Sequence, residues 1–379
     1  MRLKWIALAL AAGCAAAPPP AAAEIKIGVN LALTGPAAAL GIPVRNGFGF
    51  CPAEIAGEKL NFIILDDAGD PGQATTNARR FVTEDKVDIL MGSSNTPQSH
   101  AIAGIALETG TPQFAFGPMG LPPDRMKWTF VMPQAVSLMA KGVFEHMKKN
   151  NITTVGFIGF SDSWGDLWVR EFKAQAEPLG LKMVAEERYA RADTSVTGQA
   201  LKLVAAKPDA ILVAGSGTGA ALPQLAIRER GYAGPMYHTH GIVGPDFLRV
   251  AGKSAEGIIL PSGPPIVAEL QSDGALTKAP GLALVKPYEA KFGPGTRNQF
   301  AGHSFDACLV LQRIVPVALK SAKPGSKEFR DALLKATESE KDIAASHGVY
   351  NFTPADHSGL DERGRVLLTV KDGAWVLVK

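Results

Sequence analysis

A unit of strand, small-residue loop and helix occurs twice in the sequence, and this repeat constrains the fold more than any other feature. The first copy, over 88–106, runs from a short apolar segment through small residues into a helix start. The second copy, over 208–219, has the same order. Each copy is followed by another strand and loop, at 113–117 and at 236–240. Two similar units that each present a polar loop predict two α/β lobes with a ligand cleft between them.

The loops of the two copies hold the first candidate ligand contacts. In the first copy we expect Thr96 to be the N-cap of its helix, with Pro97 at the first helical position. The Thr96 hydroxyl would then lie beside free backbone N–H groups, a setting that binds anions such as carboxylates. The alternative is that Thr96 serves only as a cap. In the second copy Ser216 matches Thr96, and His240 matches Gly117.

The order of strands and helices indicates the fold class. From Ile25 onward, predicted strands alternate with predicted helices, which is typical of a mostly parallel sheet with helices on both faces. After about residue 261 the pattern becomes mainly helical, and the tail is rich in strands with a hairpin turn at Asp372-Gly373. Pro52 should interrupt the first helix or delay its start. We therefore predict an α/β fold of two doubly wound parallel-sheet lobes.

The same order divides the chain between the two lobes. Lobe 1 is predicted to comprise 24–131 and 260–345. Lobe 2 is predicted to comprise 132–259 and 346–379. The chain then crosses between the lobes three times, and we place the crossings near 130–133, 257–261 and 346–350.

Residues 1–23 are predicted to be a secretory signal peptide. Arg2 and Lys4 precede a short apolar run, and small residues lead to a cleavage site near Ala23. The run is shorter than the roughly 20 residues that a membrane-spanning helix needs. A lipoprotein cleavage site at Cys14 is the alternative, but alanine stands where leucine is usual, three residues before the cysteine. We expect a periplasmic protein.

Charge, length and cysteine content bear on the partners, the number of domains and a possible disulfide. Removal of Arg2 and Lys4 with the signal peptide lowers the formal net charge from +3 to +1, and the basic residues are not clustered, so we expect no nucleic-acid partner. The length suits two domains, each with its own core. Cys51 and Cys308 would remain in an oxidising compartment, where they either pair or stay as buried thiols.

Signatures of enzymes and of metal sites are weak. The glycines of 215–219 have the wrong spacing for a nucleotide-binding loop, and the next strand ends at His240 instead of an acidic residue that could bind a ribose hydroxyl. His238 and His240 could share a metal ion, but no nearby cysteine or acid completes a ligand set. No Gly-x-Ser-x-Gly nucleophile motif occurs. We therefore expect no enzymatic activity, no cofactor and no metal.

An ordered set of short motifs resembles the extracytoplasmic substrate-binding proteins of branched-chain amino acid type ABC transporters. The motifs span nearly the whole mature chain, at 25–36, 66–71, 92–96, 164–165, 251–257 and 304–307. The resemblance implies a type I periplasmic-binding fold that closes around one ligand on a three-crossing hinge, periplasmic binding proteins being a standard example of hinge closure. It also implies membrane permease subunits as partners of what we expect to be a monomer. A soluble ligand sensor on the same fold is the alternative from another functional class.

The resemblance also implies roles for particular residues. Amino acid binders of this family hold the ligand carboxylate on the first lobe, and the matching positions here are Thr96, Gly117 and Met119. They normally pair the ligand ammonium with an acidic residue and an aromatic hydroxyl on the second lobe, where this chain has His240 and Ser216. Burying an ammonium without a partner costs several kcal/mol, and a helix N-terminus offsets only about 0.3–2 kcal/mol. An α-amino acid is thus a poor candidate unless Asp162 reaches the ligand.

A small aromatic acid fits the remaining candidates better. Asn95 belongs to the polar loop before Thr96, and we expect apolar walls from Leu40, Trp164 and Phe300. Burying a ring of roughly 150 Å² at about 25 cal/mol per Å² contributes around 4 kcal/mol before association costs. A benzoate-like or hydroxycinnamate-like carboxylate is the predicted ligand, and a branched-chain or other amino acid is the alternative.

Overall fold

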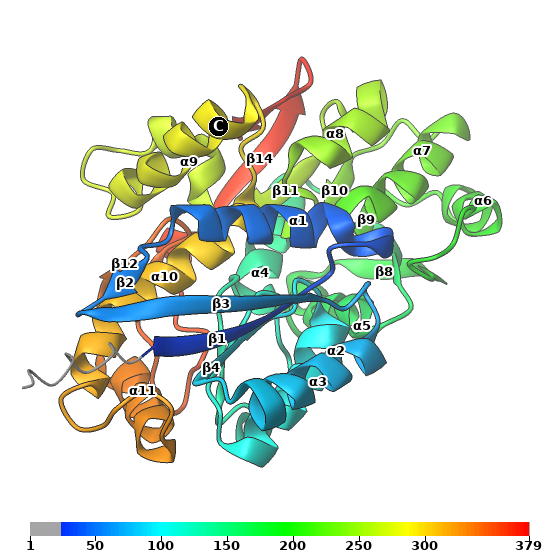
Figure 1. Ribbon diagram of the computed structural model, residues 1–379. Helices are drawn as coiled ribbons and strands as arrows, with labels where there is room; N and C mark the ends of the chain where they lie inside the picture. Colours follow the sequence, from blue (N-terminus) through cyan, green and yellow to red (C-terminus); the bar gives the residue numbers. More distant parts are fainter. Residues whose placement is uncertain (1–23, 379) are drawn as a thin grey trace, which may run out of the picture.

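The computed structural model describes residues 24–378 as two α/β lobes, each built on its own sheet (Figure 1). Residues 1–23, which hold the predicted signal peptide and Cys14, lie outside the described residues. The first lobe contains a six-stranded sheet and the second lobe a seven-stranded sheet, and a large hydrophobic core surrounds each sheet. The predicted fold class is confirmed. Within 24–378 no helix is long and apolar enough to cross a membrane.

The sheet of the first lobe has the strand order β2-β3-β1-β4-β5-β6, and only β2 and β3 pair in an antiparallel manner. Its strands are β1 (Glu24–Leu31), β2 (Glu54–Ile55), β3 (Glu58–Asp66), β4 (Ile89–Gly92), β5 (Gln113–Ala115) and β6 (Thr129–Val131). Its helices are α1 (Ala38–Gly47), α2 (Pro71–Arg80), α3 (Thr96–Thr109), α9 (Lys278–Phe292), α10 (Gln299–Ala318) and α11 (Lys327–Ser339). Helix α1 packs on α10, and α2 packs on α3 (Figure 1). Strand β4 is buried along its whole length, as expected for a parallel strand with both faces covered.

The sheet of the second lobe has the order β15-β14-β11-β10-β9-β7-β8. Its strands are β7 (Thr154–Phe160), β8 (Lys182–Tyr189), β9 (Ala210–Ala214), β10 (Met236–His238), β11 (Ile259–Ser262), β14 (Val366–Lys371) and β15 (Ala374–Leu377). Its helices are α4 (Val136–Lys149), α5 (Ser163–Glu171), α6 (Thr197–Ala205), α7 (Ala221–Glu229) and α8 (Pro245–Ala251). The predicted hairpin at Asp372-Gly373 is confirmed, since β14 and β15 pair on either side of it and both turn residues have positive φ.

The crossings between the lobes differ in detail from the expected boundaries. The first follows β6, as expected. The boundary expected at residue 260 falls inside β11, whose four residues all pair with β14, so the second crossing follows Ser262. The third crossing comes later than residue 346, because Tyr350 and Phe352 still pack in the first core and the chain enters the second sheet only at Val366. Tyr350 is held there by a 2.6 Å hydrogen bond from its hydroxyl to the Met132 carbonyl.

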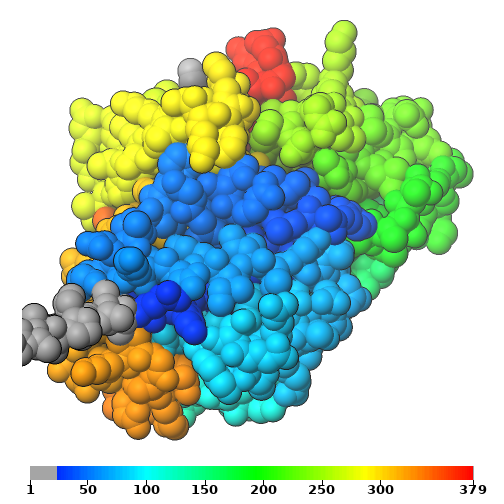
Figure 2. Space-filling model, viewed as in Figure 1, coloured from blue at the N-terminus to red at the C-terminus, as the bar shows by residue number. Residues whose placement is uncertain are grey.

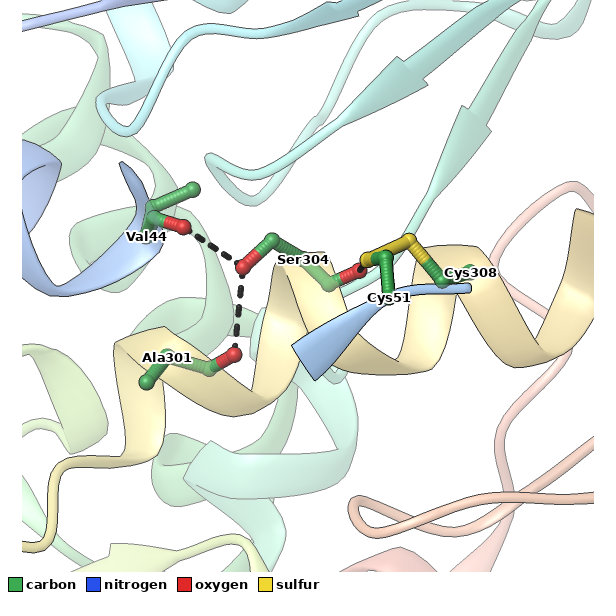
Figure 3. Close-up of a disulfide and its surroundings, with 5 residues drawn as sticks. All are labelled: Val44, Cys51, Ala301, Ser304 and Cys308. Atoms are coloured by element: carbon green, nitrogen blue, oxygen red, sulfur yellow. Dashed lines mark hydrogen bonds between the residues drawn. A yellow bond between two sulfur atoms is a disulfide. The ribbon is translucent and has the colours of Figure 1, made fainter. Parts of the chain in front are cut away.

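A disulfide joins Cys51 to Cys308 and settles the question that the sequence left open (Figure 3). Helix α1 ends at Gly47 and a short 3₁₀ turn ends at Phe50, so the helix stops before Pro52, as expected. Cys51 follows that turn directly, and Cys308 lies in α10. The bond therefore fastens the end of the α1 segment to α10 within the first lobe.

Candidate functional site

A cavity lies between the lobes, at the ends of the parallel strands where ligands bind in open α/β sheets. The space between its lining residues is about 330 Å³, part of which is open to solvent. Both lobes contribute to its lining: Leu40, Ser94, Asn95, Thr96, Phe116, Pro118, Pro133, Trp164, Arg191, Ser216, His240, Gly241, Phe300 and His303. The structure thus brings together all the predicted site residues except Gly117 and Met119.

The first lobe supplies three polar side chains from the loop between β4 and α3. Asn95 occupies the N-cap position, with extended φ and ψ of −124° and 152°, and Thr96 is the first helical residue. The prediction that Thr96 is the N-cap is therefore wrong by one residue. No side chain caps this helix, and Ser94 Oγ, Asn95 Nδ2 and Thr96 Oγ1 are buried without a hydrogen-bond partner among the described residues. Buried polar atoms normally have partners, so this set is suited to a polar ligand group.

The second lobe presents the matching N-cap residue. Ser216 is the N-cap of the 3₁₀ helix η7 (Gly217–Ala220), so it corresponds to Asn95 and not, as predicted, to Thr96. The two matched residues meet the same cation, because Arg191 Nη1 lies 3.0 Å from Ser216 Oγ and 3.3 Å from Asn95 Oδ1. The guanidinium of Arg191 consequently spans the cleft between the lobes.

Arg191 is held in place by its own lobe. Its Nε donates to Asp162 Oδ2 at 2.6 Å, and its guanidinium lies 4.2 Å from the centre of the Phe160 ring. Asp162 also accepts a hydrogen bond from the Trp164 backbone at the start of α5. Asp162 does not line the cavity, and its charge is already paired with Arg191. Sequence reasoning missed Arg191, because it lies in a loop after β8 that no motif distinguishes.

Two buried imidazoles complete the polar lining. His240 follows β10 and His303 belongs to α10, and the ring nitrogens of both lack partners within the described part of the chain. Burial lowers the pKa of His240 to about 3 and lowers the pKa of His303 well below its usual range. Both rings are therefore neutral near pH 7, and each can donate one hydrogen bond and accept another. His303 was also missed, although Phe300 of the same helix was predicted.

Apolar side chains form the walls of the cavity. Trp164 is buried, and its Nε1 donates to the Gly215 carbonyl at 3.2 Å, which fixes the orientation of the ring. Leu40 and Phe300 face the cavity from α1 and α10, and Phe116 adds a further ring from the loop after β5. Aromatic and aliphatic walls with a few polar groups are typical of small-molecule sites.

The two remaining predicted residues lie outside the cavity lining. The backbone N–H of Gly117 donates to Ser99 Oγ at 3.3 Å, so it does not point at a ligand. A Cβ at Gly117 would lie 2.5 Å from the Asn95 carbonyl carbon, and glycine is needed there for the loop to pack against the start of α3. Met119 lines a separate surface pocket with Met126 and His357. The Gly117 N–H is thus already bonded within the first lobe, and an anion site at the Met119 backbone stays a prediction.

The rims of the cleft are in contact on both sides. Gly217 packs against Leu40 with no room for a Cβ, which would lie 2.7 Å from Leu40 Cδ1. On the other side Arg170 Nη1 donates to the Gly120 carbonyl at 3.2 Å across the lobes. In Figure 2 the blue surface that contains α1 lies directly against the green surface of the second lobe. The two lobes are therefore in direct contact at both edges of the cavity.

Comparison with known proteins shows the same architecture. A family model described as "Periplasmic binding protein" matches residues 24–373. An extracellular ligand-binding receptor from Rhodopseudomonas palustris has a TM-score of 0.94 and 61% sequence identity, over 95% of this chain and 100% of that chain. The Leu/Ile/Val-binding protein BraC3 of Rhizobium johnstonii is 25% identical over 93% of both chains. An ABC-transporter solute-binding protein from R. palustris, solved in complex with benzoate, has a TM-score of 0.80 at 20% identity and covers 94% of this chain and 95% of its own.

The family model covers almost all of the described chain, and the two lobes with a cavity between them are the architecture of that family. Its members bind small-molecule ligands outside the cytoplasm and work with ABC permease components. The chain therefore belongs to the periplasmic binding protein family, as a type I member of the branched-chain amino acid class of ABC-transporter substrate-binding proteins.

Proposed function

We propose that this protein captures a small aromatic carboxylate, benzoate-like or hydroxycinnamate-like, in the inter-lobe cavity and delivers it to an ABC permease. The observation that carries the proposal is the charge of the lining. Among the described residues that line the cavity, Arg191 is cationic and none is acidic. An anion is therefore favoured at this site, whereas the ammonium of an amino acid would be buried without a counter-charge.

The polar groups suggest how such an acid is oriented. In the proposal, the carboxylate accepts hydrogen bonds from the unpartnered hydroxyls of Ser94 and Thr96, near the start of α3 and Arg191. The neutral rings of His240 and His303 hydrogen-bond a ring hydroxyl or a second polar group. An amino acid would also need an anionic partner, and Asp162 is already bound to Arg191. A buried charge without a partner costs several kcal/mol.

The apolar lining of the cavity supports a ring as the apolar part of the ligand. Trp164, Phe300 and Phe116 all line the cavity, so a ring would lie against aromatic side chains. Burying a ring of roughly 150 Å² contributes around 4 kcal/mol before association costs. Benzoate is bound by one protein of the same fold and the name of another relative refers to leucine, isoleucine and valine, so the lining residues must decide between these classes here.

A melting screen of the mature protein tests the proposal. The panel contains benzoate, 4-hydroxybenzoate, cinnamate and 4-hydroxycinnamate, with leucine, isoleucine and valine for comparison. A ligand at a hundred times its dissociation constant adds about 2.7 kcal/mol to the free energy of unfolding. We expect at least one aromatic acid to raise the melting temperature and the three amino acids to leave it unchanged. Stabilisation by the amino acids, and by none of the aromatic acids, would contradict the proposal.

A further inference from the structure

His347 is a fully buried residue at which all three crossings between the lobes meet. Gln134, from the first crossing, donates to the His347 carbonyl at 3.3 Å. A Cβ at Gly263, from the second crossing, would lie 2.5 Å from the His347 ring. A Cβ at Gly364, from the third crossing, would lie 2.8 Å from the His347 carbonyl oxygen. Because Gly263 and Gly364 have no side chain, the second and third crossings pack directly against His347. We therefore expect movement of either crossing to move His347.

A buried carboxylate fixes the orientation of His347. Asp306 of α10 accepts the backbone N–H groups of Ser346 and His347, both at 2.8 Å. Its Oδ2 also lies 3.1 Å from His347 Nδ1, and Ser346 Oγ lies 3.2 Å from the same nitrogen. The two backbone bonds hold the chain at His347 against α10, and the contacts at Nδ1 orient its ring.

The His347 ring in turn faces the ligand cavity through one neighbour. Its centre lies 4.6 Å from the ring centre of His303, which lines the cavity. A Cβ at Gly302 would lie 2.3 Å from His347 Cε1, so the helix turn that carries His303 also packs directly on this ring. No other described residue that lines the cavity stacks on His347.

We infer that His347, oriented by Asp306, is a positioning residue that couples the three crossings to the ligand cavity through His303. A change in the arrangement of the crossings moves His347, and this moves the imidazole that a ligand would meet. In the other direction, a ligand that holds His303 also holds the hinge in its closed arrangement. The inference rests on the proposed function only in taking this cavity as the ligand site.

The test uses two variants of the full mature protein and one matched control. His347→Asn keeps an amide donor near the position of Nδ1, so Asp306 stays paired, but it removes the part of the ring that contacts Gly263 and His303. Gly263→Ala leaves His347 in place and pushes its ring from the second crossing. The control is His238→Asn, which alters another fully buried histidine, in β10 of the second lobe and outside the crossings, whose Nε2 lies 2.8 Å from Gln224 Oε1.

Two readouts separate coupling from general loss of stability. The first is the affinity for 4-hydroxycinnamate by calorimetric titration. The second is the inter-lobe distance distribution without any ligand, from spin labels on Leu107→Cys in α3 and Leu201→Cys in α6, which are exposed on opposite lobes. Urea unfolding of every variant records its stability.

We expect His347→Asn and Gly263→Ala to weaken 4-hydroxycinnamate binding at least tenfold and to broaden the distance distribution. His238→Asn should lower stability while keeping wild-type affinity and distances. If both test variants keep the wild-type distance distribution, or lose no more affinity than the control, the inference is overturned. If the wild type binds none of the acids, the proposed function fails separately, and the ligand-free distances alone still decide the inference.

Discussion

At the residue scale, the polar side chains of the cavity differ from ordinary buried polar groups because several of them have no partner within the chain. Thr96 is an example, since its hydroxyl is buried and makes no cap or other hydrogen bond with the described residues. If Thr96 were the N-cap, its hydroxyl would accept a backbone N–H bond and stabilise α3. Because the N-cap is Asn95, the hydroxyl of Thr96 has no capping role.

Replacement of Thr96 should therefore affect binding more than folding. Thr96→Val removes a hydrogen bond to a charged carboxylate, worth about 1.5–3 kcal/mol, or roughly tenfold to a hundredfold in affinity. Calorimetric titration should show this loss for the acid and a smaller loss for the corresponding amide. The matched control is Thr109→Val at the other end of α3, whose hydroxyl bonds to the Ile105 carbonyl at 2.8 Å. Equal affinity of wild type and Thr96→Val for the acid would remove Thr96 from the site.

His240 should make the protein sensitive to acid. Burial lowers its pKa in the folded protein to about 3, whereas an unfolded chain protonates histidine near pH 6.5. Between these values the unfolded state binds more protons, so the free energy of unfolding falls as the pH falls. One such group accounts for about 1.4 kcal/mol per pH unit, or about 2 kcal/mol between pH 6.5 and 5.

His240→Gln should remove this share of the acid sensitivity. Urea unfolding at pH 7.5, 6.5 and 5.0 would show a shallower dependence on pH for the variant than for the wild type. The other buried histidines remain in both proteins, so the comparison isolates His240. Parallel curves for the two proteins would mean that His240 is accessible to protons in the folded state.

Site residues that follow a strand in the repeated unit were predictable from the sequence, and those placed by tertiary contacts were not. Thr96, Ser216 and His240 were predictable, because each follows a strand in the repeated unit and strand ends converge at one edge of the sheet. Arg191 was not, because its place over the cavity results from contacts with Asp162 and Asn95 that only the folded chain creates. The one-residue error at Thr96 is of the size expected when cap positions are assigned from pattern alone.

At the element scale, α1 and α10 form one wall of the cavity. A hydrogen bond, a close backbone contact and a disulfide hold the two segments together. Ser304 Oγ of α10 donates to the Val44 carbonyl of α1 at 2.6 Å (Figure 3). A Cβ at Gly47 would lie 2.2 Å from the Ala301 carbonyl oxygen, so glycine allows the two helices to approach closely. The disulfide then joins the end of the α1 segment to α10. Leu40 and Phe300 project from this joined pair into the cavity.

Loss of the disulfide should lower stability. Its cysteines are 257 residues apart in the sequence, and closing a long loop restricts the unfolded chain, with a typical effect of 2–4 kcal/mol. We expect a Cys51→Ser and Cys308→Ala double variant to unfold at a lower urea concentration by about that free energy. Adding a reductant to the wild type serves as the matched comparison. Identical midpoints for the oxidised wild type and the double variant would show that the bond does not contribute.

The elements themselves were largely predictable, and the connections were not. Alternating apolar runs and helix patterns located β1, β4 and β9, because buried parallel strands are continuously apolar. The second and third crossings were displaced, because β11 and the segment around Tyr350 are assigned to a lobe by tertiary pairing and packing. Local sequence contains no signal for which of two similar sheets a short strand will join.

At the scale of the whole molecule, ligand binding depends on whether the lobes can close. Gly217 is at the point where the second lobe meets Leu40 of the first lobe, and its φ is +55°. Gly217→Ala places a methyl group 2.7 Å from Leu40 Cδ1, so closure should be hindered and affinity for an aromatic acid should fall. Small-angle scattering with the acid present should give a larger radius of gyration than for the wild type.

The control for this variant separates backbone strain from the contact between lobes. Gly231 has a similar positive φ of +79°, and a Cβ there would meet nothing within 4 Å. Gly231→Ala should therefore have a comparable backbone cost and unchanged ligand affinity. If both variants bind the acid equally well, the contact between Gly217 and Leu40 is not required for closure.

The central claim is that the cavity accepts a small aromatic carboxylate and rejects the same skeleton with an ammonium group. The most direct measurement is a pair of calorimetric titrations of the ligand-free mature protein with 3-phenylpropanoate and with phenylalanine, which differ only in the α-ammonium. The account predicts binding of 3-phenylpropanoate at one site per chain and at least a hundredfold weaker binding of phenylalanine, because none of the described lining residues is acidic. Equal or tighter binding of phenylalanine would contradict it.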